Sequence, residues 1–576
     1  MYDVELEERE LSHQPAAQAR VELTPALLVL RADWIRSICS VFFVSAVVYC
    51  LFFHRLADRN LWSSHEARAA MDAQTMLDDG GWGLPHLYDG RAELQKPPLY
   101  YWLVALIARA RGGIVDAWAV RLPATLSAVG CLAVVFWLAW RRGRIVAGMI
   151  AATVLATAIH FTWLGRVGRI DMPLTLAISL SLALLYLRVV PISARPRGDV
   201  QPLVKSASPG GRPLNDRSHS LLVAYLALAA GLLLKGPIAF VLPAAVICLF
   251  LLSEGHLRHP LRWFHRLGTW WGLPLAFGLA AVWFAWANRA TGNELFQTFF
   301  VHHNLDRALG ENVVDRWSHP WWLYGPLFAA NFLPWSLVVP VAGWLILRNG
   351  WWRDDPEIRF GAIWFAAIFG VLSCVSFKRA DYLLPAYPGA ALLIGGVGER
   401  LYTWGVTRRR LVVAFAIMAI SCAGGWLVFL HTVMPWKDRK LEYQTFATEI
   451  RQLCPKPRQL TFFRTESHAL AFHVGRPLDI FVEWEKLAER ASRPEPQYIV
   501  MPLARFKECS EHVRADRLEK LLTSSHVKPL LLVRTRPLTA AATADESADA
   551  GTAATAADRQ RTVQRSLAGP QRPAGP

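Results

Sequence analysis

Charged and aromatic side chains gather in a few short segments of a chain that is otherwise strongly apolar. The first segment, residues 61–102, is LWSSHEARAAMDAQTMLDDGGWGLPHLYDGRAELQKPPLYYW, with His65, Glu66 and Arg68 near its start and Lys96 near its end. It is too polar to cross a bilayer and too rich in Trp, Tyr, Pro and Gly for a solvated linker. We expect a helix with Ser63 or Ser64 as its N-cap, ended by the glycines Gly80, Gly81 and Gly83. A charged, aromatic loop of this kind suits chemistry at a membrane surface.

Two later segments add ionisable residues beside long apolar runs. Residues 165–173, GRVGRIDMP, hold Arg166, Arg169 and Asp171, and Lys235 interrupts an apolar stretch in LLLKGP. Ionisable side chains at such positions are costly unless they are paired or functional. Two interpretations stay open. Arg169 and Asp171 could simply neutralise each other at the interface, and Lys235 could meet either a lipid phosphate or an anionic substrate.

Two further segments carry charge between apolar runs. The turn Phe377-Lys378-Arg379-Ala380-Asp381-Tyr382 has three charges and a tyrosine, which is more than a helix cap needs. The longer segment 288–320 contains His302 and His303 close to Asp306. Adjacent histidines near an aspartate could bind a metal, but their spacing matches no tight metal-binding signature. We assign no metal site, and a divalent ion stays an open alternative.

These segments combine cations, carboxylates and histidine next to apolar sequence. Arginine and lysine suit an anionic phosphate, and a carboxylate or a neutral histidine can take a proton from a hydroxyl. The apolar flank suits a lipid tail. The combination predicts group transfer from a lipid-linked phosphate donor, with cations that stabilise the departing phosphate. The chain has no Walker-type loop for direct ATP use, and the helix at His65-Glu66 lacks the second histidine of a zinc protease.

Membrane spans must position these segments. The chain has 576 residues, 53% of them hydrophobic and 25 of them Trp, with a mean hydropathy of +0.25, which argues against an ordinary soluble enzyme. Apolar runs of about 17–25 residues are long enough to span a bilayer core. They predict roughly eleven spans, at 34–53, 119–140, 145–163, 173–190, 221–234, 237–253, 270–287, 321–347, 359–377, 382–397 and 411–431. Residues 99–111 are predicted to form an interfacial helix instead, because a span there would break the charge pattern.

The net charge of +17 could indicate nucleic-acid binding in a soluble chain, but the positive-inside rule accounts for it here. Basic clusters flank the spans at 141–144, 188–217, 258–266, 348–353 and 408–410. If these lie in the cytoplasm, the charged segments form outer loops at 54–118, 164–172, 288–320 and 378–381. We therefore expect a multi-pass protein of the cytoplasmic membrane, with its active site facing the periplasm or outside and no nucleic-acid partner.

Composition divides the chain into four parts: a cytoplasmic tail at 1–32, a transmembrane domain at 33–431 with a cytoplasmic linker at 191–220, an outer α/β domain at 432–538 and a low-complexity tail at 539–576. The predicted fold class is an all-α polytopic membrane protein with a small C-terminal α/β domain. Its expected strands are 459–463, 479–482, 497–501 and 527–533, and its expected helices lie near 439–453, 466–474, 483–491 and 503–523. A disulfide between Cys454 and Cys509 stays open, since spacing does not decide it.

The order of motifs resembles the polytopic GT-C glycosyltransferases, in particular the bacterial relatives of the dolichyl-phosphate-mannose protein mannosyltransferases, which include the lipid A aminoarabinose transferases. The resemblance covers about residues 55–400. Each motif is weak alone, but the ordered set is specific. The motifs are His65-Glu66-Ala67-Arg68, Trp82 to Gly90, Lys96-Pro97-Pro98 to Trp102, Arg121-Leu122-Pro123, Arg169-Ile170-Asp171-Met172, Leu234-Lys235-Gly236-Pro237, His302-His303, Pro334-Trp335, and Lys378 through Leu383-Leu384-Pro385.

The resemblance implies about 11–13 transmembrane helices, an outer active site, an undecaprenyl-phosphate-linked sugar donor and inversion at the sugar carbon. It implies that Lys96 contacts the donor phosphate, that Asp171 is an acidic site residue, and that Arg68 and Tyr382 help to build the pocket. Together with the charges above, the candidate phosphate-binding set is Lys96, Arg68, Arg169, Lys235, Lys378 and Tyr382.

Two departures from the family pattern affect the chemistry. The family's usual catalytic aspartate in the first loop is replaced by His65, so the catalytic candidates are His65, Glu66 and Asp171. A neutral His65 could serve as a base near pH 7, Glu66 could take over, or the acceptor or the activity could have changed. Gln95 stands where the aminoarabinose transferases carry a glutamate, which weakens a metal site there.

The predicted function is transfer of a sugar to a lipid, glycan or protein acceptor by an enzyme surrounded by membrane lipids. One alternative is a transporter or flippase of lipid-linked glycans, which should concentrate ionisable residues near the middle of the membrane. Another is a catalytically altered homologue that binds the donor without turning it over.

Overall fold

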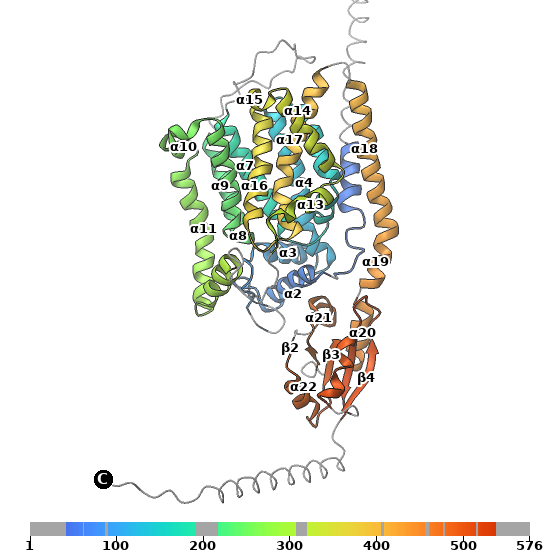
Figure 1. Cartoon of the computed structure of the whole chain (residues 1–576). Helices are drawn as coiled ribbons and strands as arrows, with labels where there is room; N and C mark the ends of the chain where they lie inside the picture. Colours follow the sequence, from blue (N-terminus) through green and yellow to red (C-terminus); the bar gives the residue numbers. More distant parts are fainter. Residues whose placement is uncertain are drawn as a thin grey trace, which may run out of the picture.

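The computed structural model describes residues 42–61, 63–86, 90, 92–190, 217–306, 319–404, 408–441, 443–454, 460–475, 479–513 and 517–536. Within them, long helices lie side by side in a bundle, and a small sheet follows at one end of it (Figure 1). The two predicted tails lie outside the described residues, as does most of the predicted linker 191–220. The linker is shorter than predicted, because helix α8 already begins at Arg217.

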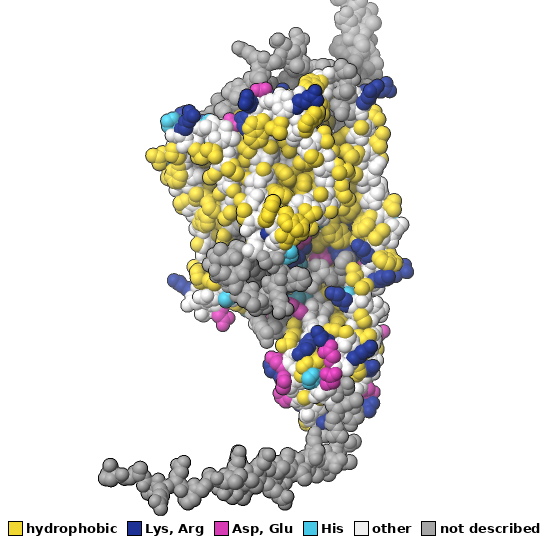
Figure 2. All heavy atoms as spheres, in the orientation of Figure 1, with side chains coloured by type: hydrophobic (Ala, Val, Ile, Leu, Met, Phe, Trp, Pro, Cys, Tyr) yellow, Lys and Arg dark blue, Asp and Glu magenta, His cyan; other side chains and the backbone are white. Residues whose placement is uncertain are grey.

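The bundle contains α4 (Ala117–Arg141), α5 (Ile145–Thr157), α6 (Ile159–Leu164), α7 (Asp171–Val189), α8 (Arg217–Lys235), α9 (Ile238–Ser253), α11 (Thr269–Ala290), α13 (Tyr324–Asn331), α14 (Val338–Arg348), α16 (Pro356–Cys374), α17 (Tyr387–Thr403) and α18 (Arg408–Val428). Shorter elements join or extend these: η1 (Tyr49–Phe53), α10 (Pro260–Arg266), η3 (Phe296–Asp306), α15 (Trp351–Asp354), η6 (Ala380–Ala386), η7 (Phe429–Val433) and α19 (Met434–Leu441). Figure 2 shows a broad band of hydrophobic side chains around this bundle, with Lys and Arg side chains at its two ends.

Helices lie at all eleven predicted span positions, although not all reach full length. In the described part of the chain, five helices are long and apolar enough to cross a membrane: Ala117–Arg141, Asp171–Val189, Thr269–Ala290, Pro356–Cys374 and Val412–Leu453. The predicted span 321–347 is not one continuous helix. It is divided into the segments Trp321–Asn331 and Trp335–Arg348, whose axes are bent by 119° relative to each other. Pro334 lies at the break, where its ring nitrogen cannot donate a helical hydrogen bond.

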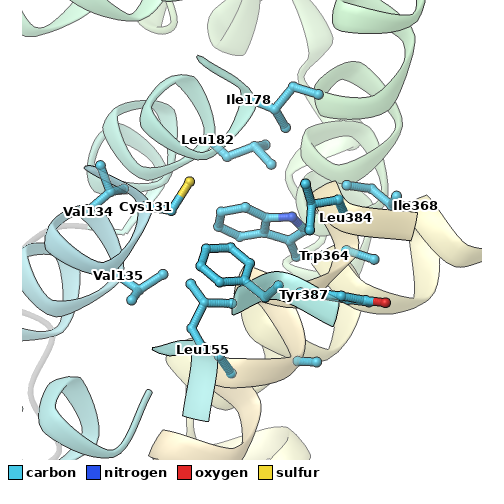
Figure 3. Packing of buried hydrophobic residues seen from close by; sticks show 14 of the residues in the cluster. Cys131, Val134, Val135, Leu155, Ile178, Leu182, Trp364, Ile368, Leu384 and Tyr387 are labelled. Carbon is cyan, nitrogen blue, oxygen red and sulfur yellow. The ribbon is translucent and has the colours of Figure 1, made fainter. Parts of the chain in front are cut away.

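The largest hydrophobic core fills the centre of the bundle. Trp364 of α16 lies among Ile178 and Leu182 of α7 and Leu155 of α5 (Figure 3). The Nε1 of Trp364 donates a hydrogen bond to the carbonyl of Pro385 at 2.9 Å, so its one polar atom is satisfied inside the core. This packing joins α16 to η6, which carries the charged turn predicted to belong to the site.

Two short helices lie at the end of the bundle that faces the sheet: α2 (Ser64–Asp79) and α3 (Leu99–Ala110) (Figure 1). The start of α2 agrees with the prediction, because the helix follows Ser63. It ends at Asp79, just before Gly80, the first of the three predicted glycines, whose φ of 71° suits glycine. A helix is also present where residues 99–111 were predicted to form one. The first outer segment therefore forms a layer across one end of the spans.

The C-terminal sheet has the order β2-β1-β3-β5-β4, with β1 parallel to β2 and β3 and the other pairs antiparallel. Its strands are β1 (Leu460–Phe463), β2 (Ile480–Phe481), β3 (Tyr498–Pro502), β4 (Leu518–Thr523) and β5 (Leu530–Thr535), with helices α20 (Gln444–Leu453), α21 (His468–Val474), α22 (Trp484–Ala491) and α23 (Leu503–Phe506). Residues 503–523 were predicted as one helix. That prediction was wrong, because residues 518–523 pair with β5 as an edge strand.

Each face of the sheet has its own hydrophobic core. Cys454 packs with the core on one face and Cys509 with the core on the other. The two thiols are therefore on opposite sides of the sheet and do not form a disulfide.

The sheet domain docks on the first outer helix. Ala67 and Met71 of α2 share a hydrophobic cluster with Leu470 and Ala471 of α21. Phe472 packs against this cluster and also against the one formed by α2, α3 and α4. The C-terminal domain therefore contacts the helix that carries the first candidate site residues.

Candidate active site

A cavity of about 180 Å³ lies where the first outer segment, the 168–171 segment, the end of α8 and the 377–382 turn meet. Most of the predicted site residues line it, although they come from distant parts of the sequence. Its lining is His65, Arg68, Ala69, Gln95, Lys96, Tyr100, Tyr101, Gly168, Arg169, Ile170, Asp171, Lys235, Phe377, Arg379 and Tyr382. The bundle thus brings together cations, one carboxylate and tyrosines around one cavity.

Asp171, the first residue of α7, is the carboxylate of this cavity. Its Oδ1 lies 2.5 Å from the Nζ of Lys235, and its Oδ2 lies 3.4 Å from the Nε of Arg169. Only 5% of its side chain is exposed. The helix start also favours a negative charge, since the first backbone N–H groups of α7 lie there. Asp171 is therefore ionised and held between two cations.

Asp381 forms a second acidic position beside the first. Arg169 extends its guanidinium from Asp171 to Asp381, whose Oδ2 lies 2.6 Å from Arg169 Nη2. Arg379 reaches the same oxygen at 3.1 Å. The result is a continuous chain of alternating charges, in which every member except Asp381 lines the cavity.

His65 lies between two cations. Its Nδ1 is 3.5 Å from the Nζ of Lys96, and its Nε2 is 3.2 Å from the Nη2 of Arg379. Burial lowers the pKa of His65 to about 2, and the charges of Lys96, Arg169 and Arg379 add to the effect. The expectation that His65 serves as a base near pH 7 does not fit this environment. A neutral His65 instead accepts a hydrogen bond from one of these cations.

Lys96 is held in the cavity by the segment around it. Burial lowers its pKa to about 8, while Glu93 acts in the opposite direction. Arg68 supports this segment: its Nη1 donates to Gln95 Oε1 at 2.7 Å, and its Nε lies 3.3 Å from Glu93 Oε2. Arg68 therefore lines the cavity, but its guanidinium contacts Gln95 and Glu93 and so holds the segment that carries Lys96 in place.

Glu66 does not line the cavity. Both of its oxygens accept from Arg59 at 2.9 Å, and its Oε1 also accepts from Arg121 Nε at 2.8 Å and the backbone N of Gly168 at 3.0 Å. Its side chain is fully buried, and the two arginines hold its pKa below the usual value against the opposing effect of burial. The hypothesis that Glu66 replaces the missing aspartate is therefore not supported, because it lies outside the cavity and both of its oxygens are held by buried arginines.

Gly168 explains why this arrangement is so tight. A Cβ atom there would lie 2.4 Å from Cγ1 of Val120 and 2.8 Å from its carbonyl oxygen. Only glycine lets the segment approach α4 closely enough to reach Glu66. Glu66 thus fixes the 168–171 segment, and through it Arg169 and Asp171.

Lys378 also lies outside the cavity. Its Nζ donates to the carbonyl oxygens of His319, at 3.2 Å, and Val375, and its side chain is buried. The next residue, Arg379, faces the cavity instead. Sequence reasoning found the charged turn but selected the wrong neighbour, because a one-residue step reverses which side chain points inward. Asp381 was noticed as part of the same turn and not assigned to the site.

An apolar groove continues from the polar cavity. A neighbouring cavity of about 210 Å³ shares Lys96, Asp171, Lys235 and Tyr382 with it. This groove extends along Leu174, Ile238, Leu242, Phe299, Leu372 and Pro385. At the junction, the Nζ of Lys235 lies 4.0 Å above the ring of Tyr382, a cation–π contact. The cavity and the groove together therefore have a cationic end and an apolar end.

The structure gives no support for a metal centre within the residues that it describes. No group of three or more His, Cys, Asp or Glu side chains gathers there in a way that could hold an ion. The candidate at His302, His303 and Asp306 is not tested, because the side chains of His303 and Asp306 lie outside the described part.

Comparison with known proteins supports the resemblance seen in the sequence. Residues 95–192 match a family described as dolichyl-phosphate-mannose-protein mannosyltransferase. The chain is 28% identical over 350 residues to the undecaprenyl phosphate-alpha-4-amino-4-deoxy-L-arabinose arabinosyl transferase of Pseudomonas paraeruginosa, which covers 59% of this chain and 56% of the relative. It is 26% identical over 471 residues to an uncharacterized protein of Aquifex aeolicus, covering 74% and 85% of the two chains. The chain thus spans little more than half the length of the curated transferase.

The fold is similar to that of two solved membrane proteins. ArnT from Cupriavidus metallidurans bound to undecaprenyl phosphate matches with a TM-score of 0.67 at 18% identity, covering 86% of this chain and 97% of that one. The archaeal oligosaccharyltransferase AglB from Archaeoglobus fulgidus matches with a TM-score of 0.50 at 12% identity, covering 86% and 74%. These likenesses confirm the predicted fold class, a polytopic GT-C bundle with a small C-terminal sheet domain.

Proposed function

We propose, on the premise of this GT-C fold, that the protein transfers a sugar from a polyprenyl-phosphate-linked donor to a lipid, glycan or protein acceptor. The similarity to a transferase whose name specifies an undecaprenyl phosphate sugar supports this proposal. The observation that carries it is the shape of the site. A cavity lined by Lys96, Lys235, Arg169 and Arg379 opens into an apolar groove.

The donor fits this space in one orientation. Its phosphate lies at the cationic end, where Lys96 and Arg379 flank His65 and Lys235 flanks Asp171. Its isoprenoid chain lies along Leu174, Leu242 and Phe299 in the groove. Hydrogen bonds from charged donors are roughly twice as strong as neutral ones, so the cations give most of the phosphate affinity.

Asp171 is the proton acceptor in this proposal. The acceptor hydroxyl attacks the anomeric carbon of the sugar, the bond from that carbon to the phosphate oxygen breaks, and the configuration inverts. The hydroxyl proton passes to Asp171, and the electron pair of the broken bond stays on the polyprenyl phosphate. A donor phosphate that draws Lys235 toward itself weakens the ion pair at Asp171 and frees one carboxylate oxygen. The cations around His65 stabilise the charge that develops on the leaving phosphate.

The proposed site lies on the outer side of the cytoplasmic membrane. The support is the distribution of arginines: Arg353 belongs to α15, Arg348 ends α14 just before it and Arg144 pairs with Asp355 just after it. Helix α15 lies at the end of the bundle away from the site (Figure 1), where positive residues indicate the cytoplasm. The described ionisable residues of the site lie at the other end, beside α2 and the sheet domain. This position favours an enzyme of the outer surface over a transporter, whose ionisable residues should lie near the membrane centre.

The test uses purified protein in lipid with undecaprenyl phosphate-linked 4-amino-4-deoxy-L-arabinose and a lipid acceptor. We expect Asp171→Asn to lower the rate of undecaprenyl phosphate release by about 10²–10⁴-fold, the usual range for loss of a general base, with donor binding retained. The matched control is Asp116→Asn, since Asp116 is a half-exposed residue that caps α4 away from the cavity.

Three other outcomes would change the proposal. Release by Asp171→Asn at the wild-type rate would remove Asp171 from the reaction. Tight donor binding by the wild-type protein with no release for any sugar or acceptor would support the binding homologue. Movement of the intact donor between leaflets without release would support the flippase.

A further inference from the structure

A second cavity, of about 210 Å³, shares no lining residue with the catalytic cavity or its groove. It lies where the end of the first helical segment, Trp163 and the junction of η7 with α19 meet. Its lining, called here the arginine pocket, is Arg55, Leu56, Asp58, Arg59, Trp163, Arg166, Leu430, Met434, Pro435, Asp438 and Arg439.

Positive charge exceeds negative charge in and behind the arginine pocket. Four arginines and two aspartates line it. Behind its wall, Glu66 is shared between Arg59 and the fully buried Arg121, so that one carboxylate faces two guanidinium groups. Five arginines therefore face three acidic residues. Of these, Arg59, Arg121 and Arg166 are buried, and Glu66 is the one buried carboxylate of the set. An excess of buried cations is costly unless an anion compensates it.

Arg166 shows where the excess lies. Its side chain is 5% exposed, and its guanidinium donates to the backbone carbonyls of Leu51, at 3.0 Å, and His54. No carboxylate among the described residues lies within ion-pair distance of it. Burial is the main reason that the pKa of Arg166 falls to about 9; the charges of Arg59 and Arg121 contribute in the same direction, and Asp58 acts against them.

The arginine pocket lies at the boundary between the apolar band and the sheet domain. In Figure 2, Lys and Arg side chains gather there around the lower end of α18 and α19. Trp436 of α19 is 55% exposed beside Lys440, whose Nζ lies 4.0 Å above its ring. A tryptophan with flanking lysines is typical of a membrane interface, where lipid phosphates reside. Leu430 and Met434 continue the pocket wall toward the apolar band.

We infer that the arginine pocket binds the phosphate group of a membrane lipid at the outer interface, as a second phosphate site separate from the donor site. Arg55 and Arg439 at the rim receive the phosphate, Arg166 supplies the buried positive charge, and the lipid chains lie against Leu430 and Met434. A bound phosphate would sit one ion pair away from α2, since Arg59 in the pocket wall is the bidentate partner of Glu66.

The test measures lipid retention by native mass spectrometry of the full-length protein in detergent. The probes are phosphatidic acid, phosphatidylcholine and inorganic phosphate. We expect Arg439→Gln to weaken phosphatidic acid binding by about tenfold, the loss of one charge-assisted hydrogen bond. The matched control, Lys440→Gln, changes the same charge on the next residue of α19, which does not line the pocket. It should bind as the wild-type protein does.

Phosphatidic acid could also bind to the cations of the donor cavity, so binding there must be removed before the effect of Arg439→Gln can be interpreted. The measurement is therefore repeated with Lys96→Gln and Lys235→Gln together, and the dependence on Arg439 should persist. Equal binding by Arg439→Gln and Lys440→Gln would overturn the inference, as would loss of all phosphatidic acid binding in the double variant. An effect of Arg439→Gln on inorganic phosphate with none on the lipid would overturn the assignment to a lipid.

Discussion

Position 65, where this chain has a histidine in place of the family's aspartate, changes the charge of the site. A carboxylate there would pair with Lys96 and Arg379, whereas the neutral imidazole faces both cations without cancelling their charge. The site consequently keeps more positive charge for the donor phosphate that we propose to bind there. It also leaves Asp171 as the one carboxylate among the lining residues of the described cavity.

The depressed pKa of His65 predicts an acid-dependent loss of stability. Between its unfolded pKa of about 6.5 and its folded value of about 2, the unfolded chain binds a proton that the folded protein does not. Stability should therefore fall as the pH drops below about 6.5, by roughly 1 kcal/mol per pH unit from this residue. We expect His65→Gln to show a smaller decrease in Tm between pH 7.5 and pH 5 than the wild-type protein does.

The control for this comparison is His512→Gln, at an exposed position in the sheet domain. An equal decrease in Tm for wild-type protein and His65→Gln would mean that position 65 does not remain neutral in the folded state.

Glu66 should matter for stability rather than for proton transfer. Glu66→Gln removes the carboxylate that neutralises the buried Arg59 and Arg121. Breaking a buried ion pair in this way lowers the free energy of unfolding by about 3–5 kcal/mol. Glu489→Gln, which removes an exposed i,i+4 pair with Arg493, should cost less than about 1 kcal/mol. Thermal unfolding in detergent checks both. Full stability of Glu66→Gln with loss of sugar transfer would return Glu66 to the catalytic candidates.

The sequence predicted which residues belong to the site better than it predicted the role of each residue. The motifs identified His65, Lys96, Arg169, Asp171, Lys235 and Tyr382, and all of them line the cavity. The sequence could not predict which side chains of a charged segment point into the cavity. Glu66 and Lys378 differ from their cavity-facing neighbours by one residue, and the side-chain direction depends on how α2 and the 377–382 turn pack on the bundle.

At the scale of elements, α2 is the contact between two domains. One face carries His65 and Arg68 into the cavity, and another carries Ala67 and Met71 into the core of the sheet domain. Arg68 adds a polar link, because its Nη2 lies 3.3 Å from His468 Nε2 and 3.8 Å from Glu466. The sheet domain is therefore placed to hold α2 in its working position.

Loosening this contact should slow sugar transfer without unfolding either domain. Phe472→Ala removes a half-buried ring from between α21 and α2, a loss of about 2 kcal/mol of apolar burial. We expect a lower rate of undecaprenyl phosphate release and faster proteolysis near residue 443. Trp484→Ala, which removes a ring from the core on the other face of the sheet, is the control and should leave the rate unchanged. Equal rates for Phe472→Ala and wild-type protein would make the docking irrelevant to catalysis.

The hydrophobic pattern predicted the positions of the helices well, but it did not predict features that depend on tertiary packing. Apolar runs located the helices, because a membrane span has few alternatives to a helix. The segment 503–523 was misassigned, since a short strand such as β4 depends on its partner β5 and its own pattern is weak. The 119° bend within 321–348 depends on how the halves pack, which a run of apolar residues does not encode.

At the scale of the whole molecule, the arrangement predicts which ends of the helices share a compartment. Site, α2 and sheet domain lie at one end, and α10 and α15 lie at the other (Figure 1). We expect Glu489→Cys, on exposed α22, to react with a membrane-impermeant maleimide in intact spheroplasts. Leu257→Cys, in the connection between α9 and α10, should react only after permeabilisation. Reaction of both in intact spheroplasts, or the reverse pattern, would contradict the proposed orientation.

The shared partners of Glu66 also order the biogenesis of the protein. Its carboxylate contacts Arg59, Arg121 and the backbone of Gly168, which leave the ribosome one after another. Until Gly168 has been synthesised, Glu66 lacks one of these three partners. The cavity has its full lining only after Arg379 and Tyr382, the last of its residues in the chain, and the sheet domain that docks on α2 follows them. A chain that stops before Gly168 therefore carries a carboxylate whose buried partners are incomplete.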